Sequence, residues 1–260
     1  MNVVPFWYID AFADGPFSGN PAGVLRLDRW CGEDKLHLIA REFNLPATAF
    51  AVPAEGEADY EVRWFSPRGE IGLCGHGTLA AGHALIGDRD GVVFATRTAG
   101  SVTVVRGGDI LSLSLSLPVI QAEPEYLPDA VAAIGGEPVE TLWHERGYGI
   151  LRYAEAAAIR ALTPDFAALA RIGDVQFSAT APGEDTDIVS RVFSSRAGED
   201  AVTGSAHSVL TPYWAEKLGR ASFTAFQASA RGGRLDCRLE GGRVVLGGRC
   251  VTIAEGRFLA

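Results

Sequence analysis

The 260-residue chain is 47% hydrophobic and has a formal net charge of −9, and this acidic balance without a Lys/Arg cluster argues against a nucleic-acid partner. No apolar run reaches the roughly 18 residues of a membrane span, and the N-terminus lacks the basic start of a signal peptide. We therefore expect a cytoplasmic protein with no nucleic-acid or membrane partner.

The first half of the chain is rich in strand patterns. Alternating or β-branched runs predict short strands at 3–10, 48–53, 60–65, 92–98, 101–106 and 110–117. Apolar residues recur at i, i+3, i+4 and i+7 in 33–43, which predicts a surface helix. The stretch 76–86 is apolar nearly all round, so we expect a helix that is surrounded by protein.

Three prolines at 118–129 indicate a linker near the middle of the chain. We therefore predict two domains, 1–118 and 119–260, with the last strand either staying in the second domain or returning to the first. A helix is expected at 163–171, with Thr163 as N-cap and Pro164 at its first position. A second is expected at 205–218, with a kink near Pro212. Further strands are expected at 188–193, 235–239 and 243–246.

Two segments half a chain apart resemble one another. RWFSPRGEIGLCGH at 63–76 and RVFSSRAGEDAVTGS at 191–205 share Arg, Phe, Ser and Arg at an offset of 128, and Gly75 matches Gly204 at an offset of 129. Each segment predicts a strand, a glycine turn and a helix. We infer a duplicated domain.

The two glycine turns are suited to hold an anion. The first N–H groups of a helix have no intrahelical partner, and glycine lets a ligand approach the backbone closely. The sequence contains no GxxxxGK[ST] phosphate loop, so a small carboxylate is the simplest ligand. We expect the turns to face each other across one cleft.

Few side chains beside these turns could do chemistry. Cys74 and His76 lie at a predicted helix N-terminus, which favours nucleophile or base behaviour, and Asp200 is a candidate general acid or base. Structural roles remain open for each: a capping histidine, a helix-capping aspartate and a small buried thiol. No cluster of His, Asp, Glu and Cys has metal-ligand spacing, so no metal is expected.

Several motifs resemble one known family along nearly the whole chain. They are IDAFADGPFSGNPAGV at 9–24, NLPATAF at 44–50, FSPRGEIGLCGHGTLAAGHAL at 65–85, GEDAVTGSAH at 198–207, YWAEKLG at 213–219 and QASARGGRL at 227–235. This pattern is similar to the phenazine-biosynthesis PhzF-like isomerases, which have the diaminopimelate-epimerase-like fold. The resemblance implies an α/β (α+β) protein of two similar domains, each a mostly antiparallel sheet wrapped around a central helix. It also implies a homodimer and cofactor-independent isomerisation by proton transfer in the cleft between the domains.

The resemblance assigns roles to individual positions. Asp200 and His76 match catalytic residues, and the expected substrate-binding residues are Asn20, Gly75, His76, Gly77, Gly204 and Ser205. The family's catalytic glutamate is replaced by Ala47. The related two-cysteine epimerases would place one cysteine at Cys74, while Val202 holds the position expected for the second.

Three functions follow from these positions. The first is a PhzF-like isomerase acting by proton transfer on a small carboxylate-bearing metabolite. The second is a single-cysteine epimerase or dehydratase that uses Cys74 as its base. The third is a ligand-binding or regulatory family member that has lost catalysis, because Ala47 cannot move a proton.

Overall fold

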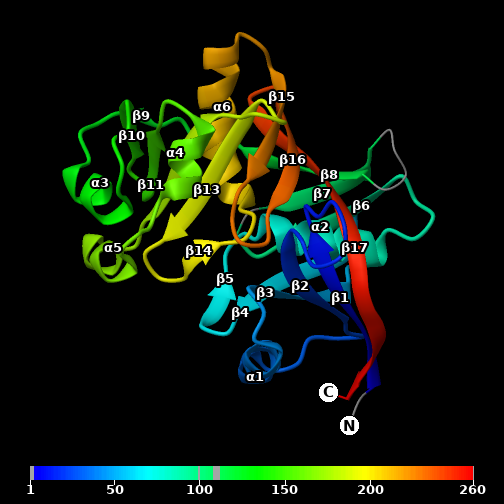
Figure 1. The fold of residues 1–260 in the computed structure, drawn as a ribbon. Helices are drawn as coiled ribbons and strands as arrows, with labels where there is room; N and C mark the ends of the chain where they lie inside the picture. The colour runs from blue at the N-terminus through cyan, green and yellow to red at the C-terminus, as the bar shows by residue number, and fades with distance from the viewer. Residues whose placement is uncertain (1–2, 99, 108–111, 260) are drawn as a thin grey trace. The chain divides into compact units, whose positions relative to one another are not determined.

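The computed structural model describes residues 3–98, 100–107 and 112–259 (Figure 1). The chain divides into two compact units, Met1–Ser116 with Gly247–Ala260 and Leu117–Leu246. The long strand β17 (Arg243–Leu259) begins in the second unit and ends in the first.

The first unit is a mostly antiparallel sheet with two helices. Its elements are β1 (Val3–Ala11), β2 (Asn20–Arg26), α1 (Glu33–Phe43), β3 (Ala47–Pro53), β4 (Tyr60–Ser66), β5 (Gly69–Ile71), α2 (Gly75–Leu85), β6 (Gly91–Thr96), β7 (Ser101–Arg106) and β8 (Ser112–Pro118), which runs past the unit boundary. Strand β1 lies between β2 and β17 and is antiparallel to both. Only β2–β3 and β4–β6 are parallel among the pairs with described register in this unit.

Helix α2 is the centre of the first unit. It packs against β1, β2, β3, β6 and β7, and its residues are buried on nearly every side, which explains its lack of a polar face. Gly82 permits this packing because a Cβ there would lie 2.6 Å from Val104 Cγ1 of β7. On the opposite face of the sheet, Leu36 and Ile39 of α1 pack with Phe50 and Phe65.

The second unit repeats this architecture. Its elements are β9 (Glu123–Pro124), α3 (Pro128–Ile134), β10 (Glu140–His144), β11 (Tyr148–Arg152), α4 (Ala156–Ala161), α5 (Phe166–Ile172), β12 (Gln176–Pro182), β13 (Ile188–Ser194), β14 (Gly198–Asp200), α6 (Gly204–Leu218), β15 (Ser222–Gln227) and β16 (Gly233–Glu240). The parallel pairs are now β11–β12 and β13–β15, and α6 packs on β11, β12 and β16. Both units therefore follow the same order of strand pairings around a central helix, as the predicted fold class requires.

One set of side-chain contacts occurs in both units. Arg63 donates from Nε and Nη2 to the two carboxylate oxygens of Glu70, each at 2.7 Å, and its guanidinium lies 5.0 Å from the ring centre of Phe65. Arg191 forms the same fork with Glu199 at 2.7 and 2.9 Å, and lies 5.1 Å from the ring centre of Phe193. The sequence repeat thus corresponds to a repeated three-dimensional contact.

The repeat also locates the inserted residue. The β4–β5 hairpin has two residues between its strands and the β13–β14 hairpin has three, so the offset is 129 from β14 onward. This corrects one expectation. The residue equivalent to Cys74 is Thr203, which is the N-cap of α6 as Cys74 is of α2, and not Val202.

The N-terminus of α5 differs from the sequence prediction. Helix α5 starts after Asp165, whose side chain accepts a hydrogen bond from Ala168 N at 2.9 Å, so Asp165 rather than Thr163 is the N-cap. Inside α6, Pro212 has no N–H for the Ser208 carbonyl, and Ile120 N donates to that oxygen instead at 3.2 Å. The predicted strand at 110–117 begins with residues that lie outside the described part of the chain, and β8 covers Ser112–Pro118.

Candidate functional site

The first turn of α2 brings together three residues of the first unit. Cys74 is the N-cap, in an extended conformation, and His76 follows in the first helical turn. The Nδ1 atom of His76 lies 3.4 Å from Asn20 Nδ2 and 3.6 Å from Cys74 Sγ. Asn20 starts β2, and all three residues are buried. A thiol and an imidazole at this distance can exchange a proton, and the amide fixes the orientation of the ring.

The glycines of this turn also lie at the start of α2, and both Gly75 and Gly77 are buried. A Cβ at Gly77 would lie 2.9 Å from Trp64 Cδ1 and 3.0 Å from Cys74 Sγ. Packing against Trp64 and Cys74 therefore requires glycine at this position, independently of any ligand.

Ala47, where the resemblance expects a glutamate, begins β3 and is fully buried. Its Cα partner in the parallel β2–β3 pair is Ala22, which is two residues after Asn20. Because alternate residues of a strand share a face, the Cβ of Ala47 points to the same face as the Asn20 side chain. A longer side chain at this position would extend on the side of the sheet where His76 lies.

The first turn of α6 gathers the predicted residues of the second unit. Asp200 ends β14, Thr203 is the N-cap, and Gly204 and Ser205 begin the helix. Asp200 accepts a hydrogen bond at Oδ1 from Ala201 N at 2.9 Å and at Oδ2 from Thr203 Oγ1 at 2.6 Å. Ser205 Oγ donates to Gln176 Oε1 at 3.2 Å. The carboxylate of Asp200 is therefore held by the same turn that leads into α6.

Two fully buried side chains contact this turn. The sequence did not predict either of them as a site residue. Gln227 hydrogen-bonds to Thr203 and Asp200, and His207 Nδ1 lies 2.8 Å from the Thr203 carbonyl oxygen. Since a carbonyl only accepts, the proton of His207 is on Nδ1. Burial lowers the pKa of His207 to about 4, against the opposing effect of the hydrogen bond to the Thr203 backbone. His207 is therefore neutral at pH 7.

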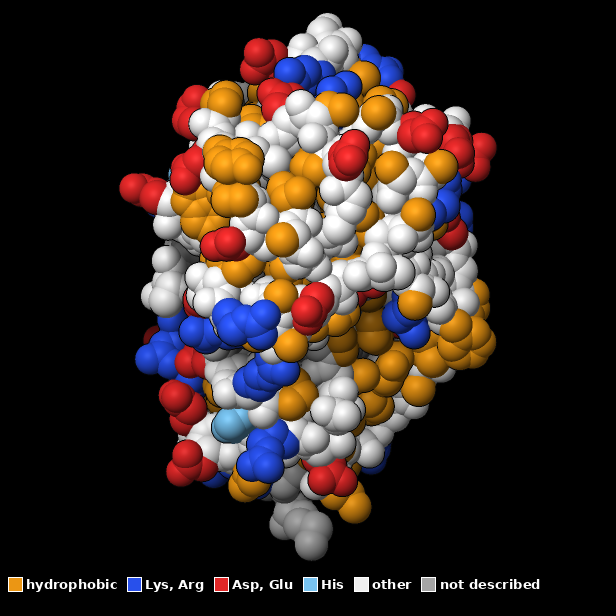
Figure 2. All heavy atoms as spheres, turned by 60° about the vertical axis from the view of Figure 1, so that its left-hand side comes forward, with side chains coloured by type: hydrophobic (Ala, Val, Ile, Leu, Met, Phe, Trp, Pro, Cys, Tyr) orange, Lys and Arg blue, Asp and Glu red, His pale blue; other side chains and the backbone are white. Residues whose placement is uncertain are grey.

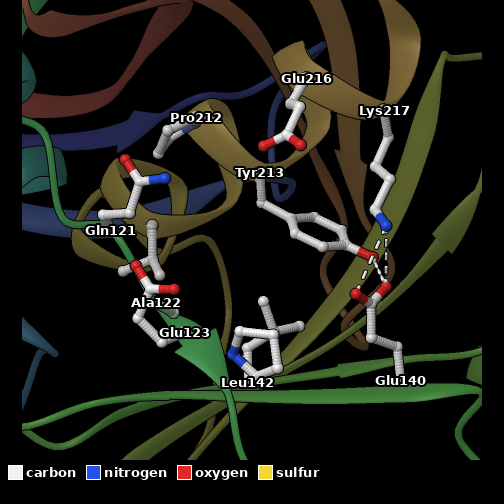
Figure 3. Close-up of a pocket in the computed structure, with 11 residues that line it drawn as sticks. Gln121, Ala122, Glu123, Glu140, Leu142, Pro212, Tyr213, Glu216 and Lys217 are labelled. Atoms are coloured by element: carbon white, nitrogen blue, oxygen red, sulfur yellow. Dashed lines mark hydrogen bonds and ion pairs between the residues drawn. The ribbon is translucent and has the colours of Figure 1, made fainter.

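A separate pocket of about 240 Å³ lies beside the middle of α6, lined by residues of α6, β9, β10 and the preceding segment (Figure 3). In it, Glu140 accepts a hydrogen bond from Tyr213 Oη at 2.7 Å and pairs with Lys217 Nζ at 3.2 Å. Burial alone would raise the pKa of Glu140, but Tyr213 and Lys217 outweigh it and the pKa is lowered. None of the residues lining this pocket is a predicted site residue.

The described residues hold no group of three or more His, Cys, Asp or Glu side chains placed to bind a metal ion. None of the helices in the described part of the chain is long and apolar enough to cross a membrane. On the face shown in Figure 2, acidic, basic and apolar side chains are interspersed.

Comparisons with known proteins identify the family and the fold. The family model for phenazine biosynthesis-like proteins matches residues 9–256. An uncharacterized isomerase of Pseudomonas aeruginosa is 45% identical over 259 residues, covering 97% of both chains. A PhzF-family crystal structure from Enterococcus faecalis aligns over 100% of both chains with a TM-score of 0.91 and 35% identity. A hydroxyproline epimerase from Agrobacterium vitis, at 15% identity, shares the fold with a TM-score of 0.60 over 98% of this chain and 92% of its own. The chain belongs to the phenazine biosynthesis-like, or PhzF, family and has the diaminopimelate-epimerase-like fold.

Proposed function

We propose that this protein is a cofactor-independent isomerase that moves a proton within a small carboxylate-bearing metabolite. The observation that carries the proposal is the repeated helix N-terminus, with an acid–base side chain beside each copy. Cys74 and His76 stand at the start of α2, and Thr203 and Asp200 stand at the start of α6. The names of the similar proteins, isomerases and an epimerase, support an isomerase-type reaction.

In this proposal the two helix N-termini hold the ligand's carboxylate between the domains. Their N–H groups and positive dipole ends favour an anion, and we assign Asn20, Gly75, Gly77, Gly204 and Ser205 to substrate binding. One acid–base group accepts a proton from a carbon of the ligand, and a proton returns to a different position of the same molecule. The reaction therefore needs no external oxidant or reductant.

The residues that exchange protons are His76 and Asp200. Asp200 is held at both carboxylate oxygens, and His76 is oriented by Asn20. Both groups can take up or release a proton without leaving their hydrogen-bonded positions, which is the arrangement that general acid–base catalysis requires. This pair would serve in place of the glutamate that Ala47 lacks.

A second scheme is favoured by one distance. Cys74 Sγ lies 3.6 Å from His76 Nδ1, so the thiol can pass its proton to the imidazole and act as the base itself. Thr203, at the equivalent position of the second unit, carries a hydroxyl that is a far weaker base than a thiolate. A single-cysteine epimerase or dehydratase would then remove the proton on one face of the ligand only.

Solvent exchange distinguishes these schemes. The protein is incubated in deuterated water with a panel of small carboxylic and amino acids, and deuterium at carbon is followed by NMR. Exchange that is lost in Asp200→Asn and His76→Asn but kept in Cys74→Ser supports the His76–Asp200 scheme. Exchange that is lost in Cys74→Ser and His76→Asn but kept in Asp200→Asn supports the thiol scheme, because His76 accepts the thiol proton in that scheme. Binding of an acid without exchange, converted to exchange by Ala47→Glu, would instead identify a family member that has lost catalysis.

A further inference from the structure

Gln227 is the last residue of β15, and its side chain is fully buried against the turn that precedes α6. Its Oε1 accepts a hydrogen bond from Thr203 N at 2.9 Å, and its Nε2 donates to the Asp200 carbonyl oxygen at 2.8 Å. Nε2 also lies 3.2 Å from Thr203 Oγ1. One amide group thus pairs with a backbone donor and a backbone acceptor of the same turn, as a neighbouring strand would.

These contacts fix the direction of the hydrogen bonds that join Gln227, Thr203 and Asp200. Thr203 N can only donate and the Asp200 carbonyl can only accept, so the Gln227 amide has one possible orientation. Since Nε2 carries only donors, Thr203 Oγ1 accepts from it and directs its own proton to Asp200 Oδ2, 2.6 Å away. A chain of hydrogen bonds therefore runs from the buried amide through a hydroxyl to the carboxylate.

We infer that Gln227 is a positioning residue, which sets the place of the Asp200 carboxylate through Thr203 and the Asp200 backbone. The inference rests on the proposed function for its catalytic consequence, but the placement of the turn is testable without it. A glutamine is rarely buried completely, and burial of an unpaired amide is costly. The amide of Gln227 is buried with hydrogen-bond partners at both its oxygen and its nitrogen. Another residue that filled the space would leave the turn's own polar groups without their partner.

Two variants separate the halves of this interaction. Gln227→Glu keeps an acceptor for Thr203 N but, once ionised, donates to neither Asp200 O nor Thr203 Oγ1. Gln227→Leu removes both the acceptor and the donors at similar volume. Thr180→Val is the matched control, because Thr180 is fully buried in the same unit and exchanges hydrogen bonds with Trp214 Nε1 and Val189 O, away from the turn.

The first measurement is deuterium incorporation into an acid that the wild-type protein exchanges, expressed per folded molecule. For Gln227→Glu between pH 6 and 9 we expect kcat to fall at least tenfold at the alkaline end while KM stays within about twofold. For Gln227→Leu we expect kcat to fall and KM to rise. Thr180→Val should lower the melting temperature and leave both constants unchanged. A kcat for Gln227→Glu equal to that of the wild type throughout this pH range would overturn the inference.

The second measurement needs no substrate. Amide hydrogen exchange of Thr203 should accelerate at least tenfold in Gln227→Leu relative to amides of β12 and β13, remain slow in Gln227→Glu, and be unaffected in Thr180→Val. Unchanged protection of Thr203 in Gln227→Leu would overturn the inference. If the wild-type protein exchanges no acid, the proposed function fails, and this measurement still decides the role of Gln227. If Gln227→Leu does not fold, the kcat of Gln227→Glu decides it.

Discussion

Cys74 and Thr203 are the N-cap residues of α2 and α6, and they stand at the same point of the two repeated units. The thiol of Cys74 lies beside His76, whereas the hydroxyl of Thr203 donates to Asp200. The two equivalent turns therefore carry different polar networks. This difference makes the two halves of the molecule separately testable.

The Thr203 hydroxyl should contribute measurably to stability. Thr203→Val keeps the shape of the side chain but removes the hydrogen bonds to Asp200 and Gln227, which should cost about 1–3 kcal/mol because one partner is a carboxylate. Urea unfolding gives the free energy. Thr203→Ser, which retains the hydroxyl, is the control and should lose less. Equal losses in the two variants would mean that packing of the methyl group, and not the hydroxyl, is what matters.

The repeated arginine forks should differ in importance. Arg191 Nη1 also donates to the carbonyl oxygens of Ile159 and Leu162, at 3.2 and 2.7 Å, at the end of α4. Lysine cannot make the fork and these contacts together, so Arg191→Lys should destabilise the protein by about 2 kcal/mol. Arg63→Lys is the matched variant. It should cost less, because the further hydrogen bond of Arg63 goes to the exposed carboxylate of Glu33 rather than to two backbone carbonyl oxygens. A larger loss for Arg63→Lys in denaturant titrations would contradict this ranking.

The Glu140–Tyr213 contact should stabilise the protein only above acidic pH. The folded pKa of Glu140 is lowered, so its stabilisation is present above the unfolded pKa of about 4.3 and is lost as pH falls through the folded value. Tyr213→Phe removes one hydrogen bond to the carboxylate and should cost about 1 kcal/mol at pH 7. Unfolding free energies measured from pH 7 to 3 should show the difference between the two proteins shrinking. A constant difference would exclude the ionised carboxylate as its cause.

His207 should make stability fall at mildly acidic pH. Its pKa of about 4 in the fold lies below the ordinary value of about 6.5, so the unfolded chain binds a proton first as pH drops. Stability is complete above about 6.5 and declines as pH falls toward 4. His207→Asn should be less stable at pH 7 but show a flatter curve across this interval. The same slope in both proteins would assign the pH dependence to other groups.

Local patterns predicted the surface helix α1 and the central helix α2. The 3.6-residue period of 33–43 and the uniformly apolar 76–86 both correspond to helices, α1 and α2. The repeat placed Cys74 and His76 at one helix start and Asp200 and Ser205 at another. The short helices α3 and α4, of seven and six residues, were missed because they complete too few turns to show a period.

These local patterns could not predict tertiary contacts. Gln227 reaches Thr203 across 24 residues of sequence, and a buried glutamine has no pattern that distinguishes it from an exposed one. The equivalence of Cys74 with Thr203 rather than Val202 depended on one extra residue in a hairpin, whose position is visible only from strand register. Pairing between strands that are distant in sequence therefore determines which side chains contact the turn before α6.

Because β17 crosses from the second unit to the first, the two units are completed at different stages of chain synthesis. The second unit is one continuous segment, Leu117–Leu246, whereas the first requires the residues from Gly247 onward, which pair with β1 from Cys250 to Leu259 (Figure 1). A ribosome working from the N-terminus makes β1 before the second unit and the partner strand after it. When the second unit has been made, β1 still lacks the partner strand on one of its sides. The half that is translated first is thus the half that is completed last.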